Sequence, residues 1–241
     1  MICARRILIP GLDNMRDLGG FITEDGKITR YGTFFRSESM FGLDESVIPL
    51  LKKHGITGCI DMHGEVDELE KRHPLRDNAE FEYYCIPKLS SIIRHEGTER
   101  DGFKEEYWIT VNIDMLETNK DWIRDVIKAC ANSKMGTVIH CRTGKTRTSL
   151  ICMMIMMLVR VPTIDIIAEY STVEIYMRDK YKRLLESSFH SEGFYKSSPF
   201  IIEETIKYIL DNYGTIESYL ESCGVTAADM SAIACKLVTE M

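Results

Sequence analysis

The chain has 241 residues, of which 44% are hydrophobic and 28% are charged, a balance typical of a globular protein with a buried core. Its formal net charge of −7 argues against a nucleic-acid partner bound through bulk positive charge. The longest apolar run, residues 150–159, is about half as long as a bilayer-spanning helix must be. The N-terminus lacks a secretory signal, because only a brief apolar stretch separates Arg6 from Pro10. We therefore expect no membrane span and a cytoplasmic location, with secretion by a signal-independent route left open.

The eight cysteines include no Cys-x-x-Cys pair, which argues against a zinc ribbon or a thioredoxin-type motif. Most of them stand in apolar stretches, where cysteine behaves as a small hydrophobic residue, so we expect a reduced protein. No group of His, Asp and Glu has the spacing of metal ligands. The sequence therefore predicts neither a metal nor a cofactor.

The first half of the chain alternates short apolar runs with helical patterns. Asp25-Gly26 predicts the turn of a hairpin over residues 21–30. Two helices and two strands are expected next, the helices over 44–54 and 65–72 and the strands over 56–62 and 81–86. Residues 88–103 are rich in charge and indicate a loop.

The second half begins with a helix that ends at about residue 117, and a second helix starts at Thr118, where Asp121 completes a capping-box pattern. A short strand is expected over 137–139 and a helix that is apolar nearly all round over 144–160. Strands that alternate with helices predict an α/β fold with a central, mostly parallel sheet flanked by helices.

The remainder of the chain is helical, with three apolar stripes that indicate core packing. The stripes are Ile202, Ile206, Ile209 and Leu210; Ile216, Tyr219, Leu220 and Cys223; and Met230, Ile233 and Leu237, the last after a Thr226/Asp229 capping signal. We expect one domain over residues 1–241, with a helical segment from about 198 to 241 packed on it.

The chemically distinctive segment is residues 140–148, His-Cys-Arg-Thr-Gly-Lys-Thr-Arg-Thr, between the expected strand and the apolar helix. Backbone N–H groups at a helix N-terminus are unpaired and favour an anion, and they stabilise the thiolate of a cysteine placed there, Cys141. An acidic chain has also gathered three cations in this loop, Arg142, Lys145 and Arg147. The loop is therefore suited to a dianionic ligand such as a phosphate monoester.

Two competing interpretations fit this loop less well. A buried cysteine at a strand end is usually inert, but neighbouring cations and an immediate helix start are not expected of such a residue. Gly144-Lys145-Thr146 ends like a nucleotide-binding P-loop, but that motif needs glycine at the position of Ile139.

The pattern His-Cys-x5-Arg-Thr resembles the signature loop of the cysteine-dependent phosphatases, the protein tyrosine phosphatase superfamily. Other segments resemble one branch, the bacterial tyrosine phosphatases related to mycobacterial PtpB, and together they run from about residue 10 to the end. These segments are 14–20 (Asn-Met-Arg-Asp-Leu-Gly-Gly), 35–37 (Phe-Arg-Ser), 60–63 (Ile-Asp-Met-His) with Glu65, and the C-terminal 213–215, 219–220 and 224–226.

The resemblance implies a role for each residue of the loop. Cys141 would attack phosphorus and form a cysteinyl-phosphate, and Arg147 would hold two phosphate oxygens. His140 would brace the loop, and Thr148 would donate a hydrogen bond to the thiolate when it leaves. The phosphate-binding residues would be Arg142, Thr143, Gly144, Lys145, Thr146 and Arg147.

The chain departs from the branch at two positions. The branch has Lys-Asp-Arg in the loop, with the aspartate proposed as general acid, where this chain has Thr146; His63 stands where arginine is expected. Two replacements for the acid remain open: Asp61, which closes a strand expected next to the loop, and Asp101 in the charged upstream loop. We favour Asp61.

The leading hypothesis is a metal-independent phosphatase that acts on phosphotyrosine or similar phosphate monoesters, on a protein or a small molecule. The three cations also suit phosphoinositides, since Lys145 is shared with lipid-acting relatives. The missing loop aspartate supports an alternative, a catalytically weak module that binds phosphorylated ligands. A rhodanese-like sulfurtransferase also uses a cysteine in an anion-binding loop, but it fits the motif less well.

Overall fold

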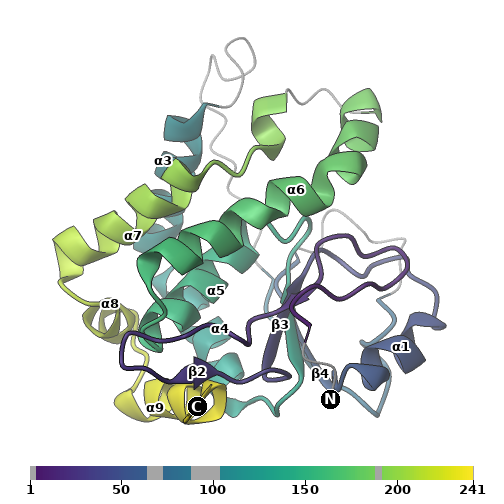
Figure 1. Ribbon diagram of the computed structural model, residues 1–241, viewed down its shortest axis with the longest axis horizontal. Coiled ribbons are helices and arrows are strands. Elements are labelled where there is room, and N and C mark those ends of the chain that lie inside the picture. Colours follow the sequence, from purple (N-terminus) through teal and green to yellow (C-terminus); the bar gives the residue numbers. More distant parts are fainter. Residues whose placement is uncertain (1–3, 64–72, 88–103, 188–191, 241) are drawn as a thin grey trace.

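The computed structural model describes residues 4–63, 73–87, 104–187 and 192–240 (Figure 1). A five-stranded sheet runs through it in the order β1-β3-β6-β4-β5. The strands are β1 (Arg16–Asp17), β3 (Phe34–Ser37), β6 (Thr137–His140), β4 (Gly58–Asp61) and β5 (Glu82–Cys85). Only the pairing of β1 with β3 is antiparallel among these neighbours. The prediction of an α/β fold with a mostly parallel central sheet is confirmed.

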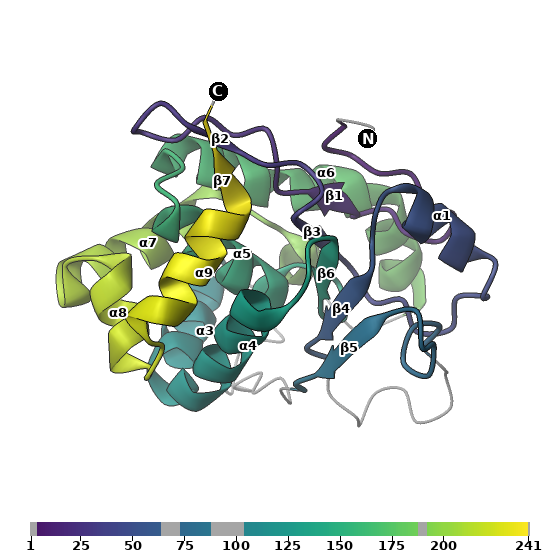
Figure 2. The same cartoon turned by 90° about the horizontal axis from the view of Figure 1, so that it is seen from below.

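Helices cover both faces of the sheet (Figure 2). Helix α1 (Val47–Lys53) lies on one face. The opposite face carries α3 (Glu105–Thr118), α4 (Lys120–Asn132), α5 (Thr146–Leu158), α7 (Pro199–Tyr213), α8 (Ile216–Ser222) and α9 (Ala227–Leu237). The long helix α6 (Thr163–Ser187) packs against α5 and α7, and a short 3-10 helix, η2 (Glu192–Tyr195), follows it. None of the helices in these described ranges has the length and apolar character needed to cross a membrane.

The pleat of the central strands divides the core in two, because successive side chains of a strand point to opposite faces. The larger core, under the helix-rich face, takes Phe34, Ile60 and Ile139 from the sheet. The smaller core, under α1, takes Phe35, Cys59 and Val138. By the same alternation Asp61 and His140, two residues beyond Cys59 and Val138, belong to the α1 face.

The expected hairpin is confirmed at its turn, where Thr23 N–H donates to Lys27 O at 2.9 Å. Beyond the turn, however, β2 (Ile28–Thr29) pairs with β7 (Val238–Thr239), so the C-terminal end of the chain adds the partner strand. The pairing is antiparallel and separate from the central sheet.

Two local predictions are wrong. Thr118 is the last residue of α3, and the residue that precedes α4 is Asn119, so Thr118 is not the N-cap of α4. Leu210 of the first C-terminal stripe is 43% exposed, since it lies off the buried face of α7. The Thr226/Asp229 capping box is confirmed. The helix expected over 65–72 and the loop over 88–103 lie outside the described residues.

Candidate active site

The loop that follows β6 lies at the carboxyl edge of the sheet. Ser37 of β3 and Asp61 of β4 both pair with His140, the last residue of β6. The segments after these strands are bonded to the loop: Ser39 N–H donates to Arg142 O, and Met62 N–H donates to His140 O, both at 3.0 Å. The loop is thus held from both neighbouring strands.

The Cys141 thiol is buried, with 2% of the residue exposed, and stands just before the first turn of α5. Burial alone would raise the pKa of the thiol. The Arg147 guanidinium, the Thr148 hydroxyl and the N–H groups of Thr148 and Gly144 outweigh burial and lower this pKa below its ordinary value. In Cys152, which lies within α5 and is equally buried, burial dominates and raises the pKa to about 12. The loop therefore favours the thiolate at Cys141 in particular.

The Arg147 side chain is buried in the first turn of α5 and donates from Nη1 to Met62 O at 2.8 Å. This bond fixes the plane of the guanidinium beside the thiol whose pKa it lowers. A planar guanidinium held this way is suited to grip two oxygens of a phosphate at once.

The three loop cations differ in their surroundings. Arg142 is exposed, whereas Lys145 is only 3% exposed and places Nζ 3.8 Å from the centre of the Trp108 ring in α3. Burial lowers the pKa of Lys145 well below its ordinary value, against the opposing effect of Glu174. Thr143 and Thr146 are partly exposed. Lys145 is thus packed on an aromatic ring in this structure.

The carbonyl groups of the loop are bonded on the side that faces the protein. Arg36 Nη2 donates to Gly144 O at 2.6 Å, and Asn14 Nδ2 donates to Thr143 O at 3.1 Å. Gly144 has a φ of +66°, and a Cβ at this position would lie 2.5 Å from Ser37 O. Only glycine fits this approach without displacing the neighbouring backbone.

A buried ion network lies under these contacts. Glu169 of α6 binds Arg16 through Oε1 and Arg36 through Oε2, the latter at 2.6 Å. Arg16 Nη1 in turn donates to Asn14 Oδ1 at 2.5 Å. Burial would raise the pKa of Glu169, but the two arginines more than offset it, so the carboxylate stays ionised. Through this network Asn14, Arg16 and Arg36, from two of the segments that resemble the bacterial branch, are joined to the loop.

Glu169 was not identified from the sequence, although a signal exists. It stands three residues after Ile166 and four before Val173, on a helix face whose apolar members are buried. A charge at such a position needs a buried partner.

The structure brings Asp61 and His140 to the same edge as Cys141. His140 is fully buried, and its Nδ1 lies 3.3 Å from Cys141 O, as expected of a residue that braces the loop. Asp61 is also fully buried: Oδ1 accepts the His63 N–H at 2.8 Å, and Oδ2 accepts the Tyr83 hydroxyl. Both Asp61 oxygens are therefore engaged by protein groups.

The sequence also drew attention to His63 and Asp101. His63, which replaces the expected arginine, is buried, places Nδ1 3.3 Å from Ser39 Oγ and packs edge-on against the Phe41 ring. Asp101 lies outside the described residues.

Comparisons with known proteins identify the family of the chain. No curated protein matches the chain. Among solved structures, TpbA from P. aeruginosa is similar with a TM-score of 0.42 and 11% identity over 91% of this chain and 95% of that one. A variant of TpbA in complex with pTyr is similar with a TM-score of 0.39 and 12% identity, over 82% and 90%. The sequence model of the tyrosine phosphatase family matches residues 7–239. The chain therefore belongs to the tyrosine phosphatase family and is a protein tyrosine phosphatase-like hydrolase of phosphoric monoesters.

Proposed function

We propose that this protein hydrolyses phosphotyrosine and similar aryl phosphate monoesters through a cysteinyl-phosphate intermediate. The observation that carries the proposal is the lowered pKa of the Cys141 thiol at a strand-to-helix junction, in spite of its burial. The thiolate attacks phosphorus, an S–P bond forms and the P–O bond to the phenol breaks. Water then attacks phosphorus, the S–P bond breaks, and inorganic phosphate leaves.

Each neighbouring group has a role in this sequence of steps. Arg147 and the N–H groups of residues 142–147 stabilise the charge that spreads over the phosphoryl oxygens in the transition state. The Thr148 hydroxyl is buried without a hydrogen-bond partner among the described residues, and we expect it to donate to the thiolate when the thiolate departs. His140 holds the Cys141 carbonyl oxygen through Nδ1, at 3.3 Å.

The role of Asp61 as proton donor to the phenolate stays a prediction. Its carboxylate is fully buried and accepts two hydrogen bonds, so proton transfer to a substrate would require it to leave those contacts. We favour a positioning role, in which Asp61 holds residues 61–63 and so the Met62 carbonyl that Arg147 grips. A phosphatase without a strong internal acid favours aryl esters, because a phenolate needs a proton less than an alkoxide does.

The direct experiment measures phosphate release from phosphotyrosine in the presence of a metal chelator, with phosphoserine and a phosphoinositide as comparison substrates. We expect phosphotyrosine to be hydrolysed faster than phosphoserine or the phosphoinositide. Cys141→Ser should lose turnover and still bind phosphate, because the loop N–H groups remain. Cys85→Ser, at an exposed cysteine at the end of β5, is the matched control and should turn over normally. Phosphate binding without turnover in the unaltered chain would support the alternative of a phospho-ligand binding module.

Activity on phosphoinositides is a separate proposal, which depends on Lys145. For Lys145 to bind a second phosphate it has to leave the Trp108 ring. Arg147→Lys should cost more than Lys145→Ala on a simple aryl phosphate, since an ammonium cannot replace a bidentate guanidinium. The order should narrow or reverse on an inositol polyphosphate. Equal losses from Lys145→Ala on both substrates would remove phosphoinositides from the proposal.

A further inference from the structure

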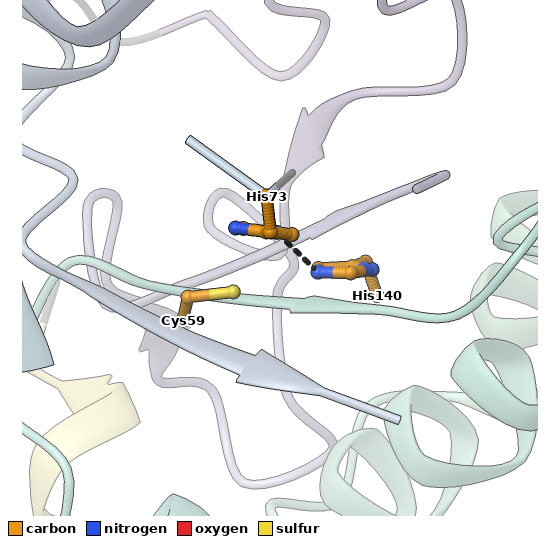
Figure 3. Close-up of side chains that lie close together, drawn as sticks. All are labelled: Cys59, His73 and His140. Carbon is orange, nitrogen blue, oxygen red and sulfur yellow. Dashed lines mark hydrogen bonds between the residues drawn. The ribbon is translucent and has the colours of Figure 1, made fainter. Parts of the chain in front are cut away.

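Three buried residues meet on the α1 face of the sheet, directly behind the catalytic loop (Figure 3). Cys59 comes from β4, His140 from the end of β6, and His73 from the segment that precedes β5. One ligand-type atom of each lies within 4.8 Å of the other two, and the two histidine rings stack 5.1 Å apart. A thiol and two imidazoles are ligands that zinc accepts, so the first question is whether the cluster is a metal site.

The hydrogen bonds answer this question by fixing the protons. The backbone N–H of Leu75 donates to His73 Nδ1 at 3.1 Å, and a backbone amide can only donate. Burial lowers the pKa of His73 to about 2, so the ring is neutral and carries its one proton on Nε2. That Nε2 lies 3.0 Å from His140 Nε2. The His73 proton therefore occupies the space between the two nitrogens, where a metal would need two lone pairs.

The same reasoning assigns the tautomer of His140. Its Nε2 accepts the proton of His73, and burial lowers its own pKa, so its one proton is on Nδ1. Nδ1 lies 3.3 Å from Cys141 O. The result is a one-way chain of three hydrogen bonds: Leu75 N–H to His73, His73 to His140, and His140 to the carbonyl of the nucleophile.

We propose that His73 is a positioning residue of the phosphatase, which acts by fixing the tautomer of His140. In a trans peptide the C=O and the following N–H point in opposite directions. While His140 holds Cys141 O, the Arg142 N–H points away from His140, as the proposed mechanism requires of a group that binds phosphate. In the other tautomer a lone pair on Nδ1 would face the carbonyl oxygen, and the peptide would lose the bond that holds it.

A competing group shows why His140 needs this control. Asp61 Oδ1 lies 3.7 Å from His140 Nε2, and as an acceptor it favours a proton on that nitrogen. The nearer His73, at 3.0 Å, presents a donor to the same nitrogen and keeps it unprotonated. Removing the donor should therefore leave Asp61 to draw the His140 proton to Nε2.

The test is ¹⁵N–¹H correlation spectroscopy of the imidazole groups, with His140→Asn used to assign the His140 signals. We expect the unaltered protein to show the His140 proton on Nδ1. His73→Phe, which keeps a buried ring and removes the donor, should show it on Nε2. His73→Gln, whose amide can donate, should restore Nδ1 protonation. Cys59→Ala is the matched control: it removes the third member of the cluster and should leave the tautomer unchanged.

Kinetics on an aryl phosphate give the second readout, and this arm rests on the proposed function, whereas the spectra do not. His73→Phe should lose about 10- to 10²-fold in kcat/KM, because a misplaced oxyanion donor costs no more than its removal, which is about 10²- to 10³-fold. His73→Gln should recover most of the loss. A His140 proton on Nε2 in the unaltered protein would overturn the proposal. So would an unchanged tautomer in His73→Phe.

Zinc binding provides the remaining arm, measured in the Cys141→Ser background so that the catalytic thiol does not compete. We expect the Cys59→Ala change to make no difference to zinc binding. Tight binding of one zinc ion that is lost in Cys59→Ala would make the cluster a metal site and would overturn the assignment of His73. If His73→Phe does not fold, the unaltered protein and His73→Gln still decide the tautomer.

Discussion

Arg36 of β3 donates a hydrogen bond of 2.6 Å to the carbonyl oxygen of Gly144 in the loop that follows β6. The same guanidinium binds Glu169 at 2.6 Å and donates to Ser149 Oγ at 2.5 Å, so one buried cation joins the loop to the sheet, to α5 and to α6. The conformation of the loop is therefore set by groups beneath it as well as by its own sequence.

Glu169→Gln should destabilise the protein. Within the described ranges, Glu169 is the only acidic side chain that forms ion pairs with both Arg16 and Arg36, which are buried. The change removes its charge. Breaking a buried ion pair by removing one partner costs about 3–5 kcal/mol. Urea unfolding measures the loss, and Glu186→Gln, at an exposed position of the same helix, should change stability by less than about 0.5 kcal/mol. Equal, small effects of both changes would contradict the role given to the network.

Gly144→Ala should damage the loop by a clash that a matched glycine does not suffer. A Cβ at Gly144 would meet Ser37 O at 2.5 Å and Asn14 Nδ2 at 2.8 Å. Gly26 has a similar φ, +79° against +66°, but its Cβ would have no neighbour within 4 Å among the described residues. Both variants carry the strain of a positive φ, so only Gly144→Ala should lose activity, by about 10²-fold for a displaced loop. Comparable kcat/KM values for both would show that the loop can shift at little cost.

Acid should weaken the fold through the two buried histidines. The pKa of His73 is lowered to about 2 and that of His140 is also lowered, in both cases chiefly by burial. The unfolded chain therefore binds protons below about pH 6.5 that the folded chain does not, and stability present above that pH is lost as pH falls. Each histidine contributes a slope of about 1.4 kcal/mol per pH unit.

Asp17 opposes this trend. Burial raises its pKa to about 6, so between that value and the unfolded value the folded chain binds more protons and gains stability as pH falls. The test that isolates His73 is thus a difference: urea unfolding of the unaltered protein and of His73→Gln at about pH 7 and about pH 5. We expect the stability of His73→Gln to fall less steeply as pH falls, by the slope that the uptake of one proton gives, about 1.4 kcal/mol per pH unit. Parallel pH profiles would mean that His73 is protonated in the folded state.

Asp61→Asn separates a proton donor from a positioning residue. If Asp61 holds residues 61–63 in place, the rate should fall by a similar factor on phosphotyrosine and on an ester of a more acidic phenol. A loss of about tenfold or more on phosphotyrosine, with a much smaller loss on the acidic phenol, would instead make Asp61 the donor. Asp101→Asn, measured on the same two substrates, tests Asp101 as the other candidate general acid.

The sequence predicted the strands and helices that carry the loop because their signals are local. The strand expected over 137–139, which the structure extends to His140, the apolar α5 and the Thr226/Asp229 cap all follow from spacing within a few residues. The capping pattern at Thr118 failed because α3 extends through Thr118 and α4 begins only after Asn119.

The site was predictable only where its chemistry is contiguous. Cys141 and Arg147 stand in one motif, whereas Glu169 reaches Arg16 and Arg36 across distant parts of the chain. His73 gave no signal either, because its role depends on a tautomer that the Leu75 N–H and the His140 ring impose in three dimensions. Long-range hydrogen bonds of this kind leave no periodicity or fixed spacing in the sequence.

The central claim is that Cys141 carries the phosphoryl group, and trapping the intermediate tests it most directly. The protein is mixed with an aryl phosphate, quenched during turnover, digested and examined by mass spectrometry for a phosphoryl group. We expect the phosphoryl group on the peptide that contains Cys141, in the protein that retains Arg147. Cys141→Ser should show neither this adduct nor turnover. Phosphate release at the unaltered rate by Cys141→Ser, with no phosphorylated cysteine in the parent protein, would contradict the covalent mechanism.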